Sequence, residues 1–310
     1  MNKETLRVSK PAYEFHDERF RALVLPHTQL ECLYQGCRWA EGPVWFNDGG
    51  YLLWSDIPNQ RILRWTPEQG TSVFRAQSNF SNGHTRDRQG RLVSCEHGTR
   101  RVSRTEPDGT ITVLADRYEG RRLNSPNDVV VHPDGSVWFT DPTYGIITDY
   151  EGYRAEPEQG GSHVYRVDPA SGAVRRVADD FVQPNGLAFS PDGRRLYVAD
   201  SGRTHDPAAP HHVREFRLRE DGGLAGGEVL LEIEPGIPDG LRVDELGNLW
   251  VSAGDGVQCF SAKGELLGKI LVPETVANLT FGGPRRNKLF ITATTSVYTL
   301  FVSVSGAQYP

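Results

Sequence analysis

One short pattern recurs six times along this chain and restricts its fold more than any other feature of the sequence. Each copy contains an oxygen-bearing residue, a short apolar strand, a tight turn, and a second strand of β-branched and aromatic residues. The copies begin at Glu41, Asn82, Asn127, Asn185, Asp239 and Asn278. Repeats of roughly 40 to 60 residues that hold several short strands are typical of β-propellers, in which each repeat forms one blade.

The six copies therefore predict an all-β fold, a six-bladed β-propeller with a central metal site. A third strand follows most copies, as in "RILRW" at Arg61 and "HVYRVD" at His163. A propeller must close into a ring, and the segment "ECLYQGCRW", residues 31–39, precedes the first copy without a blade of its own. We expect it to supply the outer strand of the last blade, so that residues 31–310 form the propeller and residues 1–30 an N-terminal extension.

Two insertions lengthen the third and fourth copies. They are "TYGIITDYEGYRAEPEQGG", residues 143–161, and "GRTHDPAAPHH", residues 202–212. We expect both to form loops over one face of the ring, because connecting segments run over the surface and often carry function. The Pro-Asp-Gly sequences inside copies, such as "HPDG" at His132, are expected to be hairpin turns.

Composition and charge argue against several kinds of partner. The chain has 310 residues, 37% of them hydrophobic, and a net charge of -6 with no basic block, which disfavours nucleic acid and anionic membranes. No run of about 18 apolar residues is present that could cross a bilayer. The N-terminal sequence lacks the apolar core of a secretory signal, so a cytoplasmic location is expected. The four cysteines have no CxxC spacing and are expected to be reduced.

The first residues of the six copies predict a binding site. Inner strands line the channel of a propeller, so residues in the same phase of every copy converge on its axis. Asn and Asp beside Pro and Gly also form turns for purely local reasons, but turns alone require no ring of acids and amides. Two carboxylates, Glu41 and Asp239, with several amide oxygens suit a hard divalent cation, and Ca²⁺ is the expected ion. Mg²⁺, Mn²⁺ and Zn²⁺ remain open alternatives.

At these residues the chain resembles the family of gluconolactonases, regucalcin (senescence marker protein) and luciferin-regenerating enzyme, and within it the bacterial gluconolactonase branch. The motifs are "RWAEGPVW" at Arg38, "LNSPNDVVV" at Leu123, "QPNGLAFSPDG" at Gln183 and "PDGLRVDELGNLWVSAGDGV" at Pro238. The resemblance implies one divalent cation held by Glu41, Asn185 and Asp239, with Asn127 beside it. It also implies hydrolysis of a small sugar lactone such as glucono-1,5-lactone to the aldonic acid.

The resemblance assigns the general base to Asp239. Because a carboxylate bound to a cation is a weaker base, the acids at the ends of the second strands are alternatives, among them Asp141 and Asp200. Asn127, His84 and Tyr144 are candidate substrate contacts, although His84 can equally be a core histidine with its hydrogen bonds satisfied. Two other functions stay open, an aryl-lactonase or phosphotriesterase on the same metal propeller, and a binding propeller without catalysis.

Overall fold

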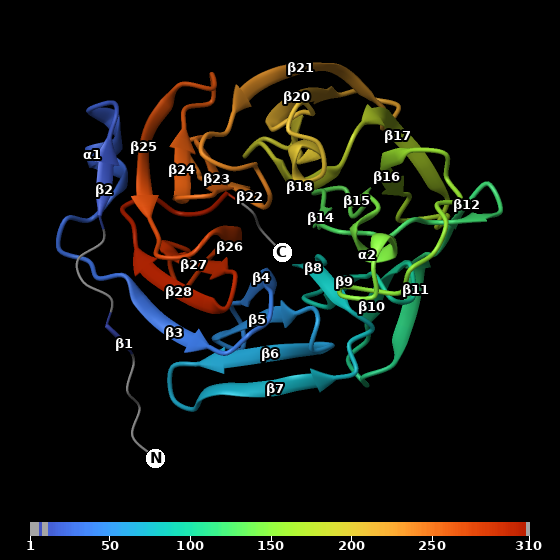
Figure 1. Cartoon of the computed structure of the whole chain (residues 1–310), viewed down its shortest axis with the longest axis horizontal. Helices are drawn as coiled ribbons and strands as arrows, with labels where there is room; N and C mark the ends of the chain where they lie inside the picture. The colour runs from blue at the N-terminus through green and yellow to red at the C-terminus, as the bar shows by residue number, and fades with distance from the viewer. Residues whose placement is uncertain (1–5, 8–11, 308–310) are drawn as a thin grey trace.

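The computed structural model describes residues 6–7 and 12–307, and six antiparallel sheets are arranged radially around a central axis (Figure 1). The predicted six-bladed β-propeller is confirmed. The inner strands are β4 (Ala40–Phe46), β8 (Ser81–Arg86), β14 (Val129–Val131), β18 (Pro184–Phe189), β22 (Leu241–Val243) and β26 (Val276–Gly282). The second strands are β5 (Tyr51–Asp56), β9 (Leu92–Glu96), β15 (Val137–Asp141), β19 (Arg195–Asp200), β23 (Leu249–Ala253) and β27 (Lys288–Ala293).

The two outer positions of each blade complete the sheets. The third strands are β6 (Arg61–Thr66), β10 (Arg101–Thr105), β16 (Ser162–Val167), β20 (His212–Leu218), β24 (Gly256–Phe260) and β28 (Ser296–Phe301). The outer strands are β7 (Gly70–Ala76), β11 (Ile111–Ala115), β17 (Val174–Phe181), β21 (Leu224–Glu232), β25 (Leu266–Leu271) and β3 (Glu31–Gln35). A separate two-stranded hairpin is formed by β12 (Arg117–Tyr118) and β13 (Arg121–Arg122).

The ring closes where the two ends of the chain meet in the sixth blade. Strand β3 pairs antiparallel with β28, with Tyr34 opposite Val297 and Cys32 opposite Tyr298. The prediction that residues 31–39 supply the outer strand of the last blade is therefore confirmed. With β3 in place the sixth blade has all four of its strands, and its inner strand β26 lies at the channel edge of the sheet as in the other blades. Radial repetition of this kind leaves only short, protected sheet edges.

Part of the N-terminal segment packs on the two last blades. Strand β1 (Leu6–Arg7) pairs with β3, and β2 (Tyr13–Phe15) adds a fifth strand to the fifth blade by pairing with β25. Helix α1 (Arg19–Leu23) follows and buries Phe20 against Trp250. No helix in the described part of the chain has the length and apolar character of a membrane span.

Apolar side chains between neighbouring blades form the core. Trp54, Trp138 and Trp250 lie in three of the second strands, and each is at most 1% exposed. Each such side chain contributes about 1.5 to 3 kcal/mol when it leaves water. The four cysteines are buried and none forms a disulfide, in agreement with the expectation of reduced thiols.

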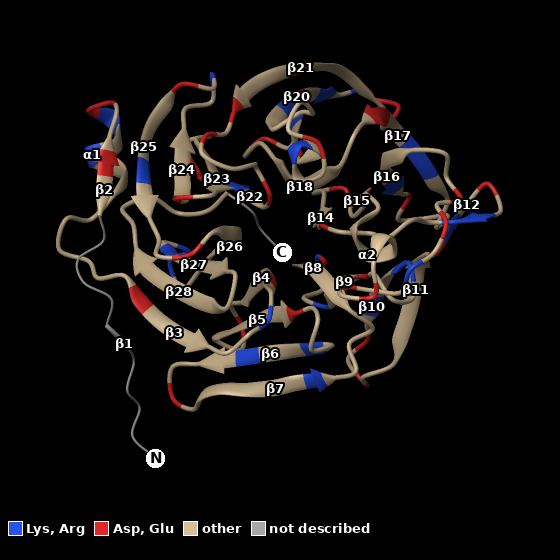
Figure 2. Ribbon diagram, viewed as in Figure 1, with Lys and Arg blue, Asp and Glu red and all other residues tan. Residues whose placement is uncertain are grey.

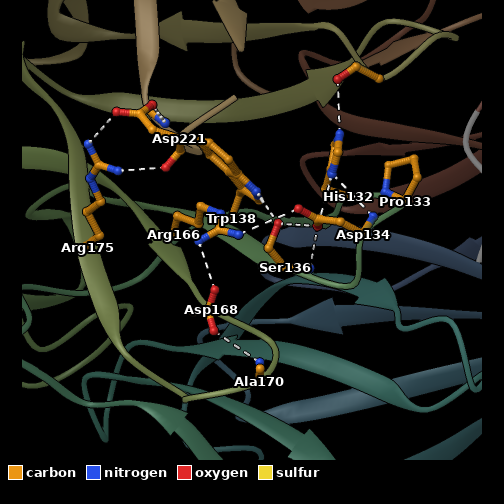
Figure 3. Close-up of polar contacts among 12 residues, drawn as sticks. His132, Pro133, Asp134, Ser136, Trp138, Arg166, Asp168, Ala170, Arg175 and Asp221 are labelled. Carbon is orange, nitrogen blue, oxygen red and sulfur yellow. Dashed lines mark hydrogen bonds and ion pairs between the residues drawn. The ribbon is translucent and has the colours of Figure 1, made fainter. Parts of the chain in front are cut away.

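The hairpin turns between first and second strands lie on one face of the propeller, and the first residues of the copies lie toward the opposite face. The "HPDG" turn joins β14 to β15, where Asp134 accepts hydrogen bonds from the Ser136 amide and hydroxyl. His132 bonds the Gly193 carbonyl in the next blade at 3.0 Å, and Arg175 pairs with Asp221 across the same two blades (Figure 3). Polar contacts between turns thus join the third and fourth blades at this face. Figure 2 shows acidic and basic residues mixed along the blades.

Backbone of neighbouring inner strands comes into direct contact around the axis. The amide of Gly83 donates to the Asn127 carbonyl at 2.8 Å, and that of Gly186 to the Asp239 carbonyl at 3.0 Å. A Cβ atom on Gly186 would lie 2.2 Å from that carbonyl oxygen. Glycine therefore follows the first residue of these copies because the next blade's backbone occupies the space of a side chain.

Replacing Gly186 with alanine should lower the free energy of unfolding by about 1 to 3 kcal/mol, because two backbones must separate. The matched control is Gly223→Ala, where the new methyl group would meet the ends of the Asp221 and Arg175 side chains, both more than half exposed. Urea denaturation measures the difference. Equal unfolding midpoints for the two variants would contradict the proposed role of Gly186.

Candidate active site

The first residues of the six copies lie together at one end of the channel. Glu41, Asn127 and Asn185 are each at most 5% exposed, whereas Asp239 is partly exposed. We call the six residues Glu41, Asn82, Asn127, Asn185, Asp239 and Asn278 the axial ring. The glycine contacts described above join the backbone after Asn82 to Asn127 and the backbone after Asn185 to Asp239, so these parts of the ring are held by backbone hydrogen bonds as well as by side-chain packing.

The two acids of the axial ring influence each other's ionisation. Burial raises the pKa of the Glu41 carboxyl from 4.5 to about 8. Burial also raises the pKa of Asp239 well above its usual value, and the charge of Glu41 adds to this effect. Buried carboxylates that repel each other either keep a proton or attract a cation. The arrangement therefore favours a positively charged ligand between them.

Amide groups of the ring support these acids. Asn278 donates from Nδ2 to Glu41 Oε2 at 3.1 Å, while its own Oδ1 accepts from the Leu279 amide at 2.8 Å. The Gly42 amide donates to the same Glu41 oxygen at 2.5 Å. Asn185 hydrogen-bonds the Asp239 carboxylate, and the Ser252 hydroxyl accepts from the Asp239 amide at 2.9 Å. Glu41 and Asp239 are thus oriented by neutral donors.

The donor set fits a hard cation. Across residues 6–7 and 12–307, no group of three or more carboxylate, imidazole or thiolate side chains is arranged to hold a metal ion. The axial ring contains just two such groups, and its other members are amides. Carboxylate and amide oxygens are the ligands that Ca²⁺ accepts, with water completing a coordination number of 6 to 8.

An ion pair that the sequence reasoning missed lies inside the channel. Asp128 and Arg242 are 1% and 4% exposed at the side chain, with 3.6 Å between Asp128 Oδ2 and Arg242 Nη1. Asp128 raises the pKa of both Glu41 and Asp239. A signal for it existed in the repeat alignment, since the position after the ring residue is glycine in four copies and an acid here.

The first insertion brings a fourth carboxylate toward the ring, in addition to Glu41, Asp239 and Asp128. Glu151 raises the pKa of Glu41 and of Asp239, and burial raises its own pKa to about 7. Its main-chain carbonyl lies 2.9 Å from His97 Nδ1. No signal in the sequence pointed to Glu151, because it belongs to a segment outside the repeats.

The two insertions meet over this same end of the channel, as expected. Tyr144, in helix α2 (Tyr144–Ile147), bonds Thr204 Oγ1 at 3.1 Å and contacts the His205 ring. Thr204 belongs to the short helix η1 (Gly202–Thr204) of the second insertion. Burial raises the Tyr144 pKa, and the charge of the Asp239 carboxylate adds to this effect, which places the phenol near the acidic end of the ring.

His84 is not brought into this group. Its ring is fully buried in β8, with Nε2 2.8 Å from Ser55 Oγ and Nδ1 2.8 Å from Ser94 Oγ. Burial lowers its pKa to about 3. Both nitrogens are therefore already paired, which matches the alternative interpretation of His84 as a satisfied core histidine.

Three of the acids that end the second strands share a structural contact. Asp56, Asp141 and Asp200 each accept a main-chain amide two or three residues before a member of the axial ring, whereas Glu96 accepts from the Asn79 side-chain amide at 3.0 Å. The contacts are Arg38 N to Asp56 Oδ1 at 2.9 Å, Asn124 N to Asp141 Oδ2 at 2.8 Å, and Gln183 N and Val182 N to the two oxygens of Asp200, both at 2.9 Å. Asp200 therefore has no free carboxylate oxygen. Asp141 keeps one, and burial raises its pKa to about 7.

Comparisons with known proteins agree with the motifs. The family model for the SMP-30/Gluconolactonase/LRE-like region matches residues 39–295. A gluconolactonase from Zymomonas mobilis is 33% identical over 317 residues, covering 93% of this chain and 85% of that protein. A pentonolactonase from Haloferax volcanii is 32% identical over 267 residues, covering 83% and 81%.

A solved structure extends the similarity to three dimensions. The gluconolactonase from Xanthomonas campestris superposes with a TM-score of 0.90 at 36% identity, covering 96% of this chain and 97% of that one. The resemblance stated from the four motifs is thereby confirmed. The chain belongs to the SMP-30/gluconolactonase/LRE-like family.

Proposed function

We propose that this protein is a metal-dependent hydrolase that opens sugar lactones, such as glucono-1,5-lactone, to the aldonic acid. The observation that carries the proposal is the pairing of Glu41 with the partly exposed Asp239 in a ring of amides. Two relatives that align with most of this chain are named for their action on lactones, a gluconolactonase and a pentonolactonase. The direct test is lactone hydrolysis by the purified protein before and after chelation.

The cation would be held by Glu41, Asn127, Asn185 and Asp239, with Ca²⁺ as the proposed ion. Such an ion polarises the ester carbonyl and lowers the pKa of bound water. The two carboxylates would balance its charge. Their mutual repulsion, which raises the pKa of both groups, would be relieved by the same ion.

Asp239 is the proposed general base. It accepts a proton from the water that attacks the lactone carbonyl carbon, and the ring C–O bond breaks as its oxygen gains a proton to become a hydroxyl. Ser252 and Asn185 hold Asp239 in place, and partial exposure gives it access to water. Asn127 and Tyr144 are the proposed substrate contacts beside it.

One observation favours a second candidate, an aryl-lactonase or phosphotriesterase. The insertion that covers the acidic end of the ring exposes Ile147, Tyr150 and Tyr153, each between 41% and 57%. An apolar rim of this kind would suit an aromatic leaving group. A panel of sugar lactones, phenyl esters and phosphotriesters would separate the candidates through their relative kcat/KM values.

Asp239→Asn should reduce turnover per bound cation by about 10² to 10⁴, because general-base assistance typically contributes that factor. Some cation affinity should persist through the amide oxygen. Asp141→Asn and Asp200→Asn serve as matched controls and should keep turnover per bound cation. The measurement is the rate at saturating Ca²⁺ divided by bound Ca²⁺. A wild-type value for Asp239→Asn would transfer the base to another residue.

In the presence of chelator, the free energy of unfolding should fall as the pH rises from about 5 to about 8. Across this window the folded protein keeps the proton on Glu41, whose pKa is about 8, whereas the unfolded chain, with a pKa of 4.5, has released it. Folding therefore binds a proton, and the free energy of unfolding decreases as the pH rises. Asp239 and Glu151 act in the same direction. Thermal unfolding at several pH values measures the effect.

Ca²⁺ should reverse this loss, by about 2.7 kcal/mol at a hundredfold excess over its dissociation constant. The rise in Tm on adding Ca²⁺ should therefore be larger at pH 8 than at pH 5. Glu41→Gln is the control, since it removes one titrating group and should shrink both effects. A Tm that is independent of Ca²⁺ at every pH would argue against a cation in the axial ring.

A further inference from the structure

Asn82, the axial-ring member in the second blade, is placed differently from the other amides. The residue is 4% exposed, and its Nδ2 lies 3.3 Å from His97 Nε2. Its Oδ1 is buried and has no hydrogen-bond partner among the described residues. A buried acceptor without a partner costs free energy in the folded protein, so this oxygen requires an explanation.

The orientation of the Asn82 amide follows from His97. A carbonyl oxygen can accept but not donate, so the contact of His97 Nδ1 with the Glu151 carbonyl at 2.9 Å places the ring proton on Nδ1. Burial lowers the His97 pKa to about 4, which keeps the ring neutral. His97 Nε2 must then accept, and the Asn82 group that faces it must be the NH₂. The Asn82 oxygen is consequently turned away from His97.

The loop that supplies the Glu151 carbonyl is closely packed onto the second blade. A Cβ atom on Gly152 would lie 2.0 Å from the Gly145 carbonyl oxygen, and one on Gly145 would lie 2.5 Å from His97 Cβ. Tyr153 of the same loop packs edge-on against Phe80 at 5.2 Å between ring centroids. The hydrogen-bonded series from Glu151 through His97 to Asn82 is therefore held at both ends.

We propose that Asn82 Oδ1 accepts a hydrogen bond from a hydroxyl group of the lactone, and that His97 is the positioning residue that aims it. This inference rests on the proposed lactonase function. The Asn82 oxygen is neutral, so it adds nothing to the negative charge that Glu41 and Asp239 already offer a cation. It can, however, accept a hydrogen bond from a hydroxyl group. A site built to bond a hydroxyl discriminates strongly against an analogue that lacks it, because the acceptor then stays unpaired. Asn82 would thus select polyhydroxylated lactones.

The test compares two lactones with the same six-membered ring, glucono-1,5-lactone and the unsubstituted δ-valerolactone. Asn82→Ala should lower kcat/KM about tenfold for the sugar lactone, the effect of one uncharged hydrogen bond. It should leave δ-valerolactone within about twofold of wild type. Calorimetric titration should give an unchanged dissociation constant for Ca²⁺, which is a readout independent of activity.

Two substitutions of His97 distinguish a role in positioning Asn82 from a role in stabilising the fold. In His97→Gln the side-chain amide can still donate to the Glu151 carbonyl and accept from Asn82, so the ratio of the two kcat/KM values should stay near that of wild type. His97→Phe fills the space without hydrogen bonds and should lower the ratio as Asn82→Ala does. A purely structural role for His97 would change Tm and both lactones together without changing their ratio.

The outcomes are distinguishable. Equal losses on both lactones in Asn82→Ala, with weaker Ca²⁺ binding, would make Asn82 an ion ligand and overturn the inference while leaving the lactonase proposal intact. An unchanged ratio with unchanged Ca²⁺ binding would also overturn it. A wild-type protein that opens neither lactone would reject the proposed function, and the inference with it.

Discussion

The site depends on how closely six strands can approach one axis. The contacts at Gly83 and Gly186 are hydrogen bonds between the backbones of neighbouring blades, and side chains at these positions would prevent them. Once the inner strands meet in this way, the residue before each contact must face the channel near its neighbours. The convergence of Glu41, Asn185 and Asp239 is therefore a consequence of strand packing, and the same packing that stabilises the ring assembles its polar centre.

Assembling acids in this way opposes stability. Glu41 and Asp239 are desolvated and repel each other, and Asp128 and Glu151 add to the negative potential. The buried guanidinium of Arg242 offsets Asp128, yet removing two charges from water is costly, so such a pair is weak evidence of net stabilisation. Functional sites commonly retain such unfavourable arrangements, because the binding of a ligand of opposite charge then gains free energy.

The repeats made the fold and most of the axial ring predictable, since six copies in one phase specify both the blade count and the residues that meet at the axis. Strand β3 was predictable because a ring must close. What the pattern could not place lies outside it. Glu151 sits in an insertion, and the pairing of His97 with Asn82 depends on how that insertion folds back. His84 has the same phase in its repeat as a channel residue, but both of its ring nitrogens are hydrogen-bonded, to the hydroxyls of Ser55 and Ser94.

Closure through β3 also sets when the site can exist. Strand β3 precedes the first blade along the chain, whereas its partner β28 follows every other strand of the ring, so β3 keeps an unpaired edge until all six blades have been synthesised. The hydrogen bond from Asn278 to Glu41 joins the same two ends of the ring. Long-range pairings of this kind form slowly because distant parts of the chain must first come together. During synthesis, the first and last blades thus meet in the same event that completes the surroundings of Glu41.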